Sequence, residues 1–316
     1  MKINKSYKYI NLLLRFVIGA IAVYFIYTRI EEDFLIHFYK IEPNKINLFI
    51  LGIVLLLMIL NWGIEAVKWR YTIRSVIDIS VLKAFKLIFS GITLGFLTPN
   101  RIGEIPARAL LLNKGNVIEI TLKTIVASFS QLLITLLFGV LGFCLTFKNF
   151  SYISNPIVWV MILSLGLLLL LMVYFRTSKL ESIFNRFTFI KKNELFRGLL
   201  GFSIIDLLYI LLLSLLRYII FSIQYYLVLK AFGVYLSDIS SIFLIPVCFM
   251  VASFIPTILI SEIGIRGSVA LFVFGTVSNM DIQIILASMV LWLINIALPT
   301  LLGLFNLKEL KLIKQA

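Results

Sequence analysis

The sequence predicts an all-α, polytopic integral membrane protein built as a helical bundle. The chain is 61% hydrophobic and 14% charged, with a mean hydropathy of +1.06, whereas soluble domains are about half apolar and a quarter charged. Its apolar stretches, such as 163–174, are continuous and lack the alternation of a membrane β-barrel strand. Two polar runs that are rich in proline, glycine and charge, 95–108 and 255–267, interrupt this background. In a membrane protein such runs are tolerated where the backbone lines a polar cavity or site.

Six apolar stretches are long enough to cross a bilayer, which takes about 20 residues in a helix. They are about 10–28, 46–64, 120–147, 156–175, 203–230 and 282–305. Two further apolar pieces, 82–97 and 239–277, are each interrupted by one of the polar runs. The first span follows Lys2, Lys5 and Lys8 without a small-residue cleavage site, so we expect an uncleaved span and not a signal peptide.

Lysine and arginine placement predicts the side of each connection. Of the 29 basic residues, 21 fall in five segments, which are 1–9, 65–86, 98–123, 176–197 and 306–316. We therefore expect these segments, and both termini, on the cytoplasmic side. Six spans satisfy this alternation if 82–112 and 239–277 form re-entrant hairpins of opposite orientation; if 239–277 crosses twice, there are eight crossings. Opposed hairpins indicate a single domain, 1–316, with inverted-repeat halves of about 1–150 and 151–316 around a midplane site.

Composition excludes several classes of function. The net charge of +14 lies in short loops beside apolar spans, as the positive-inside rule describes, and not in a nucleic-acid-binding patch; such loops also attract anionic lipid head groups. His37 is the only histidine, and Cys144 and Cys248 lie in separate apolar stretches without CxxC spacing. We therefore expect no metal site, no catalytic triad and no cofactor. No phosphate-binding Gly-rich loop with Lys-Ser/Thr occurs, so nucleotide-driven transport is not expected.

The first polar run contains Arg101, Glu104 and Arg108, spaced i, i+3 and i+7. On one helix these residues form a stripe with the carboxylate between two guanidinium groups. The stripe is either a salt-bridged cap at the membrane interface or an anion site in which the arginines bind phosphate oxygens. Pro99 and Gly103 break the chain here, and they favour the anion site because they expose backbone N–H groups at a helix start.

The second polar run contains Glu262 and Arg266 in the favourable i, i+4 order. Pro256 precedes the pair and Gly264 lies within it, as two further expected breaks. The pair is either an ion pair neutralised inside the bundle or part of a site. Pairing across the two runs, of Glu104 with Arg266 or of Glu262 with Arg101, would fit inverted repeats.

Isolated ionisable groups inside spans also need an explanation, because burying a charge in a bilayer costs about 2.5 kcal/mol or more. Arg15 is close enough to its span's end to snorkel. Arg217 lies near mid-span and needs a partner, a wet cavity or a lipid phosphate; Gln224, two turns on, could line the same cavity. Asp206 is eleven residues from Arg217, too far along a helix to pair with it. The remaining polar span residues are expected to join helices: Asn61, Ser128, Ser130, Gln131 and Asn295.

With these residues considered, the chain from about 8 to 306 resembles the transmembrane region of lysylphosphatidylglycerol synthases, also described as a flippase-like domain. The most specific element is Thr98–Glu104 followed by Arg108, similar to the family's Pro-Gly-Arg-x-Gly-Glu-x-x-Arg run. Ser214–Tyr218 with Gln224 resembles its Arg…Gln helix, and 255–267 resembles its Gly-x-Gly-x-x-Glu segment. Asn100 replaces the usual glycine, and a small residue stands at 267–268 where glutamate is expected.

The resemblance implies transbilayer movement of a lipid in a bacterial or archaeal cytoplasmic membrane. The aminoacyl-transferring soluble domain of the full-length synthases does not occur within the 316 residues, so we expect a transporter-like protein with no catalytic residues. Arg101, Arg108, Arg217 and Arg266 would offset head-group phosphate, and the glutamates would orient them or bind an amine-bearing head group. Transport would be facilitated, or coupled to an ion or proton through an acidic residue.

Two other classes of function compete with this expectation. One is a non-catalytic scaffold or lipid-presenting partner of an envelope-synthesis enzyme, which would tolerate neutralisation of the charged runs. The other is an intramembrane enzyme, which the isolated carboxylates do not favour because no nucleophile or metal partner accompanies them.

Overall fold

The structure, a computed structural model, describes residues 47–96, 98–112, 115–150, 154–177, 202–236, 238–257 and 259–309. Within these residues all regular structure is helical, which confirms the all-α prediction. The sequence-predicted span 10–28, with Arg15, and the His37 loop lie outside the described residues.

Five helices are long and apolar enough to cross a membrane, within the described part of the chain. Four of them are single helices: α3 (Leu48–Ile73), α6 (Val117–Thr146), α7 (Pro156–Arg176) and α9 (Ile204–Ala231). The fifth is α13 (Asp281–Trp292) continued by a π-helical turn, η6 (Leu293–Ala297), and by α14 (Leu298–Glu309). These match five of the six predicted spans. Polar side chains cap the starts of α3, α6 and α9; for example, Ser203 and Asp206 form a capping box at the start of α9.

The two polar runs lie at the tips of two helical hairpins. In the first, α4 (Val81–Gly95) leads through a short turn, η2 (Pro99–Arg101), into α5 (Glu104–Leu111), which packs back on α4. In the second, α10 (Ile239–Ile242) and α11 (Leu244–Phe254) lead past Pro256 into α12 (Leu259–Phe274). Each arm is shorter than the roughly 20 residues of a helical span. The hairpin alternative therefore fits better than two additional crossings.

The first tip has a left-handed backbone. Asn100 and Arg101 have φ angles of 49° and 55°, a conformation that asparagine tolerates better than most side chains. The family-like motif usually has glycine at position 100, which suits the same backbone. Because of this turn, the predicted helical stripe of Arg101, Glu104 and Arg108 is wrong: α5 begins only at Glu104, and Arg101 lies outside it.

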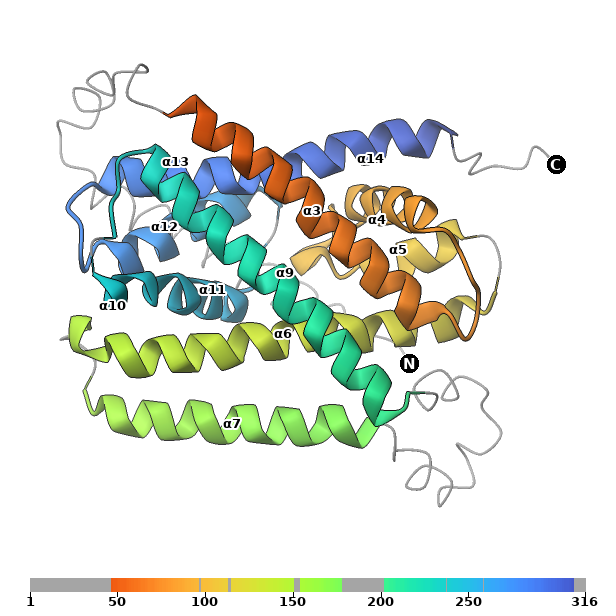
Figure 1. Ribbon diagram of the computed structural model, residues 1–316, viewed down its shortest axis with the longest axis horizontal. Helices are drawn as coiled ribbons and strands as arrows, with labels where there is room; N and C mark the ends of the chain where they lie inside the picture. The colour runs from red at the N-terminus through yellow and green to blue at the C-terminus, as the bar shows by residue number, and fades with distance from the viewer. Residues whose placement is uncertain are drawn as a thin grey trace, which may run out of the picture.

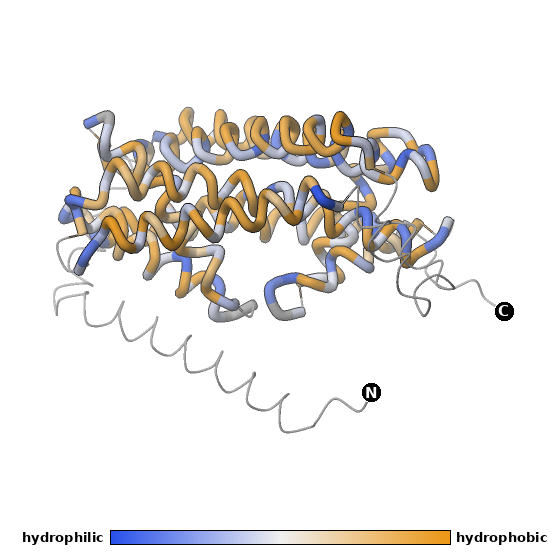
Figure 2. Tube along the Cα trace, turned by 90° about the horizontal axis from the view of Figure 1, so that it is seen from below, coloured by the Kyte–Doolittle hydropathy of each residue, from blue (hydrophilic) through white to orange (hydrophobic). Residues whose placement is uncertain are grey.

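The hairpins start from opposite ends of the bundle (Figure 1). At one end, the turn after α3 lies beside the start of α9, where Arg74 pairs with Asp206 at 2.7 Å. At the other end, the backbone N–H of Asn47, before α3, donates to the carbonyl of Ala231, the last residue of α9, at 3.3 Å. The α4–α5 hairpin begins and returns at the first end, and the α11–α12 hairpin at the second (Figure 1). Figure 2 shows the two polar tips facing each other near the middle of the long axis.

Each hairpin packs on a long helix from the other half of the chain. Outside its own hairpin, α4 packs mainly against α14, and α11 packs mainly against α6. Glycines allow both contacts: a Cβ at Gly303 would collide with the Phe89 carbonyl, and one at Gly142 would lie 2.6 Å from the Phe243 carbonyl. Small residues permit this close approach between membrane helices. An inverted repeat produces this kind of reciprocal packing; the repeat itself stays a prediction.

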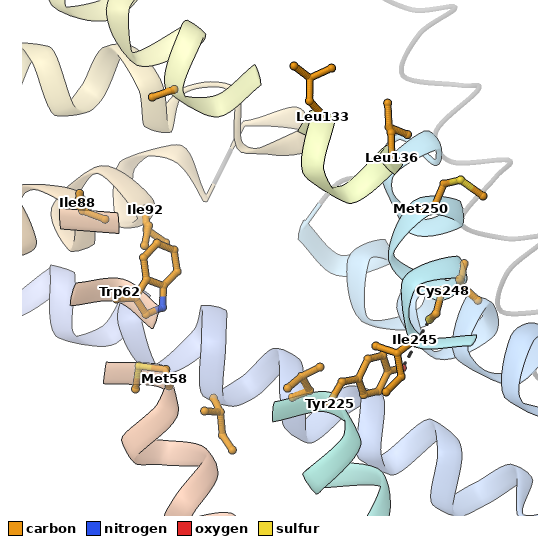
Figure 3. Packing of buried hydrophobic residues seen from close by; sticks show 14 of the residues in the cluster. Met58, Trp62, Ile88, Ile92, Leu133, Leu136, Tyr225, Ile245, Cys248 and Met250 are labelled. Atoms are coloured by element: carbon orange, nitrogen blue, oxygen red, sulfur yellow. Dashed lines mark hydrogen bonds between the residues drawn. The ribbon is translucent and has the colours of Figure 1, made fainter. Parts of the chain in front are cut away.

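The interior between these elements is closely packed and largely apolar (Figure 3). Trp62 of α3 lies beside Ile92 of α4, and Leu136 of α6 lies near Met250 of α11 (Figure 3). Tyr225 and Cys248 interact through their side chains at 3.8 Å. By contrast, α7 exposes most of its apolar side chains, as expected for a helix that faces lipid.

The glycine contact between α14 and α4 can be tested by substitution. We expect Gly303→Ala to destabilise the protein by about 1–3 kcal/mol, because the added methyl group forces two backbones apart. Thermal unfolding in detergent measures this change. Gly166→Ala in α7 is the matched control, since its Cβ would meet nothing within 4 Å; its melting temperature should not fall. Equal melting temperatures for the two variants would contradict the packing.

The approach of the two tips, where Asn100 N lies 3.0 Å from the Thr257 carbonyl oxygen, can be tested by crosslinking. With Cys144 and Cys248 replaced by alanine, we expect Asn100→Cys with Thr257→Cys to react with a short bis-maleimide and to shift in electrophoretic mobility. The control pair combines Asn100→Cys with Asn279→Cys, at the far end of the second hairpin. Crosslinking of the control pair alone would show that the tips do not meet.

Candidate functional site

The site begins with a polar stripe on α3 that the sequence-based boundaries missed. Counting apolar residues ended the span at 64, but α3 continues to Ile73. Asn61, Glu65, Lys68 and Thr72 are consequently all helical and buried. Their spacing of three to four residues places them on one face of the helix. This spacing is visible in the sequence and could have revealed the stripe.

Glu65 is the centre of a buried ion network. Its Oε1 accepts from Arg108 Nη1 at 2.9 Å, and its Oε2 accepts from Arg217 Nη1 at 2.6 Å. Lys68 Nζ lies 2.9 Å from the same Oε2. Glu65, Lys68 and Arg108 are 6%, 1% and 5% exposed. Because charges interact strongly at low dielectric, one carboxylate here holds three cations from α3, α5 and α9 in place.

Neutral polar groups complete the bonding of these cations. Lys68 Nζ donates to Ser214 Oγ at 3.3 Å, and Ser214 Oγ in turn lies 2.7 Å from Ser130 Oγ. Arg217 Nε donates to Asn61 Oδ1 at 3.0 Å, and its Nη1 also contacts Gln131 Oε1 at 3.4 Å. The expected helix-joining role of Asn61, Ser130 and Gln131 is therefore combined with direct contact to charged groups.

The second carboxylate of this network is Glu104, which pairs with Arg108 one turn further along α5. The pairing of Glu104 with Arg266, one of the two predicted cross-run pairs, does not form. Gly91 and Gly95 of α4 allow α5 to approach this closely: a Cβ at Gly95 would lie 2.5 Å from Glu104 N, and one at Gly91 would lie 2.6 Å from Arg108 Cγ. The hairpin thus inserts the Arg108 guanidinium between α4 and α3.

A second ion cluster lies on the other hairpin. Glu262, 4% exposed, accepts from Arg266 Nε and Nη2 at 3.0 and 2.9 Å. Arg101 from the first tip reaches the same carboxylate at 3.4 Å, so the other predicted cross-run pair is present. Beside it, Asn100 N donates to the Thr257 carbonyl at 3.0 Å, and Thr257 N donates to Asn100 Oδ1 at 2.5 Å. The two tips are joined by backbone and charge together.

A cavity of about 280 Å³ with a mixed polar and apolar wall lies between the two ion clusters. Three arginines line it, Arg101, Arg217 and Arg266, and they come from the first tip, α9 and α12. Uncharged polar and aromatic side chains form most of the remaining wall, among them Asn61, Gln131, Thr135, Ser253, Asn295, Trp62, Tyr218, Phe221 and Phe249. None of the cavity-lining residues is acidic. Glu65 and Glu262 form ion pairs with these arginines, but they do not line the cavity.

Other residues expected at the site lie elsewhere. Gln224 is buried and donates to the Val54 carbonyl at 2.9 Å, so it joins α9 to α3 and does not line the cavity. Asp206 caps α9 and pairs with Arg74 at the end of the bundle. Gly264 was expected as a break, but it lies inside α12. Pro99, Gly103 and Pro256 do lie at breaks: Pro99 begins the turn η2, Gly103 directly precedes α5, and Pro256 separates α11 from α12.

A larger cavity, of about 470 Å³, lies on the other face of α11. Its wall is almost entirely apolar and includes Phe143, Trp159, Met250 and Phe254. It offers no charged group, so it can hold hydrocarbon but has no means of recognising a head group.

The two ion clusters together carry excess positive charge. Among the described residues they contain five cations (Lys68, Arg101, Arg108, Arg217 and Arg266) and three carboxylates (Glu65, Glu104 and Glu262), for a net charge of +2. Uncompensated charge is costly away from water. The arrangement therefore favours an anion in the arginine-lined cavity, and arginine binds phosphate oxygens well because its N–H groups form a planar fork.

The central role of Glu65 leads to a stability prediction. We expect Glu65→Ala to destabilise the protein by about 3–5 kcal/mol, because three buried cations lose their counter-charge. The control Asp78→Asn removes an ion pair with Arg70 in which Asp78 is 74% exposed, and it should cost less than about 1 kcal/mol. Adding Lys68→Met to Glu65→Ala should recover part of the loss. Thermal unfolding in detergent measures these changes. A melting temperature of Glu65→Ala equal to that of the wild type would contradict this account.

Comparison with known proteins agrees with the membrane architecture. The family described as the lysylphosphatidylglycerol synthase TM region matches residues 12–303, which include both hairpins and every residue of the ion clusters. No curated protein and no solved structure matches the chain significantly. The matched family links the chain to a role in membrane lipid chemistry, through a transmembrane region and not a catalytic domain. The chain is thus a multi-pass membrane protein that belongs to the lysylphosphatidylglycerol synthase TM region family.

Proposed function

We propose that the protein translocates an anionic lipid across the cytoplasmic membrane, with the head-group phosphate held in the arginine-lined cavity. The observation that carries the proposal is the cavity itself: three arginines from three separate elements converge on it without a lining carboxylate. A cavity that only stabilised the fold would be expected to neutralise its own charges.

The hydrogen-bonding pattern of the arginines supports a role in binding. Arg217 uses Nε and Nη1, and Arg266 uses Nε and Nη2, for bonds to other described residues. Arg101 uses Nη2 for Glu262. In the described part of the chain, this leaves Nη2 of Arg217, Nη1 of Arg266 and Nη1 of Arg101 for a ligand. The carboxylates behind these groups fix their orientation, so little rotamer freedom is lost on binding.

The two hairpins suggest how the cavity opens. Their tips meet at the cavity, and their bases lie at opposite ends of the bundle. Alternating access in transporters with inverted repeats arises from movement of one repeat against the other around a fixed site. We infer that separation of the tips opens the cavity, and that the α11–α12 hairpin, which holds no member of the Glu65 network, moves relative to α3, α5 and α9. The basic end of the bundle would face the cytoplasm.

The mechanism requires only binding and conformational change. Arg101, Arg217 and Arg266 offset the phosphate charge while the apolar chains stay in the surrounding lipid. Of the acidic residues considered for ion or proton coupling, Glu104 and Glu262 are each paired with arginine, and Asp206 lies at the bundle end. We therefore propose facilitated movement without an aminoacyl-transfer step. The runner-up, a lipid-presenting scaffold for an envelope-synthesis enzyme, would need the same cavity to bind lipid but not to release it on the opposite side.

The test is a flip assay in proteoliposomes with tail-labelled phosphatidylglycerol, scored as the fraction of label that external dithionite reduces. We expect wild-type protein to move the lipid, and Arg217→Gln and Arg266→Gln to slow the movement at least tenfold. The reason is that a charge-assisted hydrogen bond contributes about 1.5–3 kcal/mol, and about 1.4 kcal/mol corresponds to a factor of ten.

Arg70→Gln is the matched control, because it removes an arginine from a surface ion pair that does not line the cavity; its rate should equal that of the wild type. Each variant is first shown to be folded by its melting temperature. If Arg217→Gln and Arg266→Gln moved lipid at the wild-type rate, the cavity would not be part of the lipid pathway. Folded wild-type protein that binds lipid without moving it would favour the scaffold.

A further inference from the structure

The charges around the cavity also restrict which head groups it can accept. We infer that the site selects a lipid head group that carries phosphate and net negative charge, and that it excludes head groups with an amine. This inference rests on the proposed function and narrows its substrate class. The selectivity of binding can be measured whether or not the protein moves the lipid across the membrane.

The first step concerns the carboxylates. An ammonium group in a protein site is normally held by a carboxylate or by an aromatic face. Each of the three carboxylates near the cavity is already in contact with arginine: Glu65 with Arg108 and Arg217, Glu104 with Arg108, and Glu262 with Arg101 and Arg266. None of the three lines the cavity. An ammonium group there would therefore find no counter-charge.

The second step concerns the aromatic residues. Four aromatic side chains line the wall: Trp62, Tyr218, Phe221 and Phe249. Each ring already has one face in contact with another group, because the Arg217 guanidinium lies 5.2 Å from the Trp62 ring centroid, Tyr218 stacks on Phe138, and Phe221 and Phe249 stack on each other. At Trp62, an incoming amine would compete with a residue of the same charge. Repulsion from Arg101, Arg217 and Arg266 would add to this loss, because like charges repel more strongly where water is excluded.

The third step concerns charge balance. The clusters carry a net +2 before a ligand binds. A phosphodiester head group without an amine supplies one negative charge, and a phosphomonoester supplies up to two. A zwitterionic head group supplies none, and a lysyl-bearing head group makes the total more positive. The preferred class is thus an acidic lipid phosphate, with the monoester compensating the clusters most completely.

A binding experiment tests this order directly. Purified protein in neutral detergent is mixed with phosphatidic acid, phosphatidylglycerol, phosphatidylethanolamine or lysylphosphatidylglycerol with identical acyl chains, and the melting temperature is recorded. We expect the two acidic lipids to raise it, and the two amine-bearing lipids to need at least tenfold higher concentrations for the same shift. Stabilisation by lysylphosphatidylglycerol equal to that of phosphatidylglycerol would overturn the inference. If inorganic phosphate raised the melting temperature as much as phosphatidic acid does, the site would bind free phosphate and the lipid would be ruled out as the specific ligand.

A charged residue added to the wall provides a second test. Ser253 lines the cavity and is exposed at the end of α11, so a substitution there should not disturb the fold. We expect Ser253→Asp to weaken binding of phosphatidylglycerol and to improve binding of lysylphosphatidylglycerol. Ser253→Asn, which has a similar size and no charge, should keep the wild-type order. An unchanged order in Ser253→Asp would show that head groups bind elsewhere.

The outcomes of the two proposals can be separated. The flip assay with the same four lipids measures transport, while the melting temperatures measure selectivity. If the protein bound acidic lipids selectively but moved none of them, the proposed translocation would be contradicted and the inferred class of ligand would still hold. Movement of all four lipids at equal rates would support translocation and overturn the selectivity.

Discussion

The structure depends on a single carboxylate that is buried among three cations. Glu65 is a residue of α3, and its partners Arg108 and Arg217 belong to the first hairpin and to α9. In a membrane interior each unpaired charge costs about 2.5 kcal/mol or more, and Glu65 compensates three of them. The ion network therefore fixes how α3, α5 and α9 are placed relative to one another. The glycines of α4 are needed for the same reason, because only a close approach brings Arg108 within reach.

The contact between the two tips has a different character. It consists of three hydrogen bonds between Asn100 and Thr257 and of one shared carboxylate, Glu262. Glu262 keeps its two bonds to Arg266 if Arg101 leaves. Parting the tips thus breaks few interactions and strands no carboxylate, whereas parting α3 from α9 would expose the whole Glu65 network. The rigid part of the bundle is the one whose charges are compensated between helices, and the movable part is the one whose carboxylate is compensated within its own hairpin.

Much of the architecture could be predicted from the sequence, because membrane spans follow from continuous apolar stretches. The sidedness that the basic residues indicate stays a prediction. The hairpins followed from the alternation of sides together with Pro99 and Pro256. The site was less accessible. Glu65 and Lys68 were assigned to a loop because apolar counting ends where the first charge appears, yet the helix continues for two more turns. The arginine partners of Glu65 lie 43 and 152 residues away, and no spacing rule in the sequence indicates that these charges meet. The stripe of Arg101, Glu104 and Arg108 failed because a left-handed turn at Asn100 and Arg101 separates the first residue from the helix.

The fixed position of the excess positive charge has a consequence for the energy of transport. The arginines of the cavity belong to the protein and stay within it, so the charge that crosses the bilayer is the charge of the lipid. A membrane potential does work of about 2.3 kcal/mol per elementary charge for every 100 mV. For a negatively charged head group, a potential that is negative inside acts outward. The resting voltage of the cell would then supply the direction of movement, and a protein with this cavity would need neither a nucleotide nor a coupled ion to be an exporter.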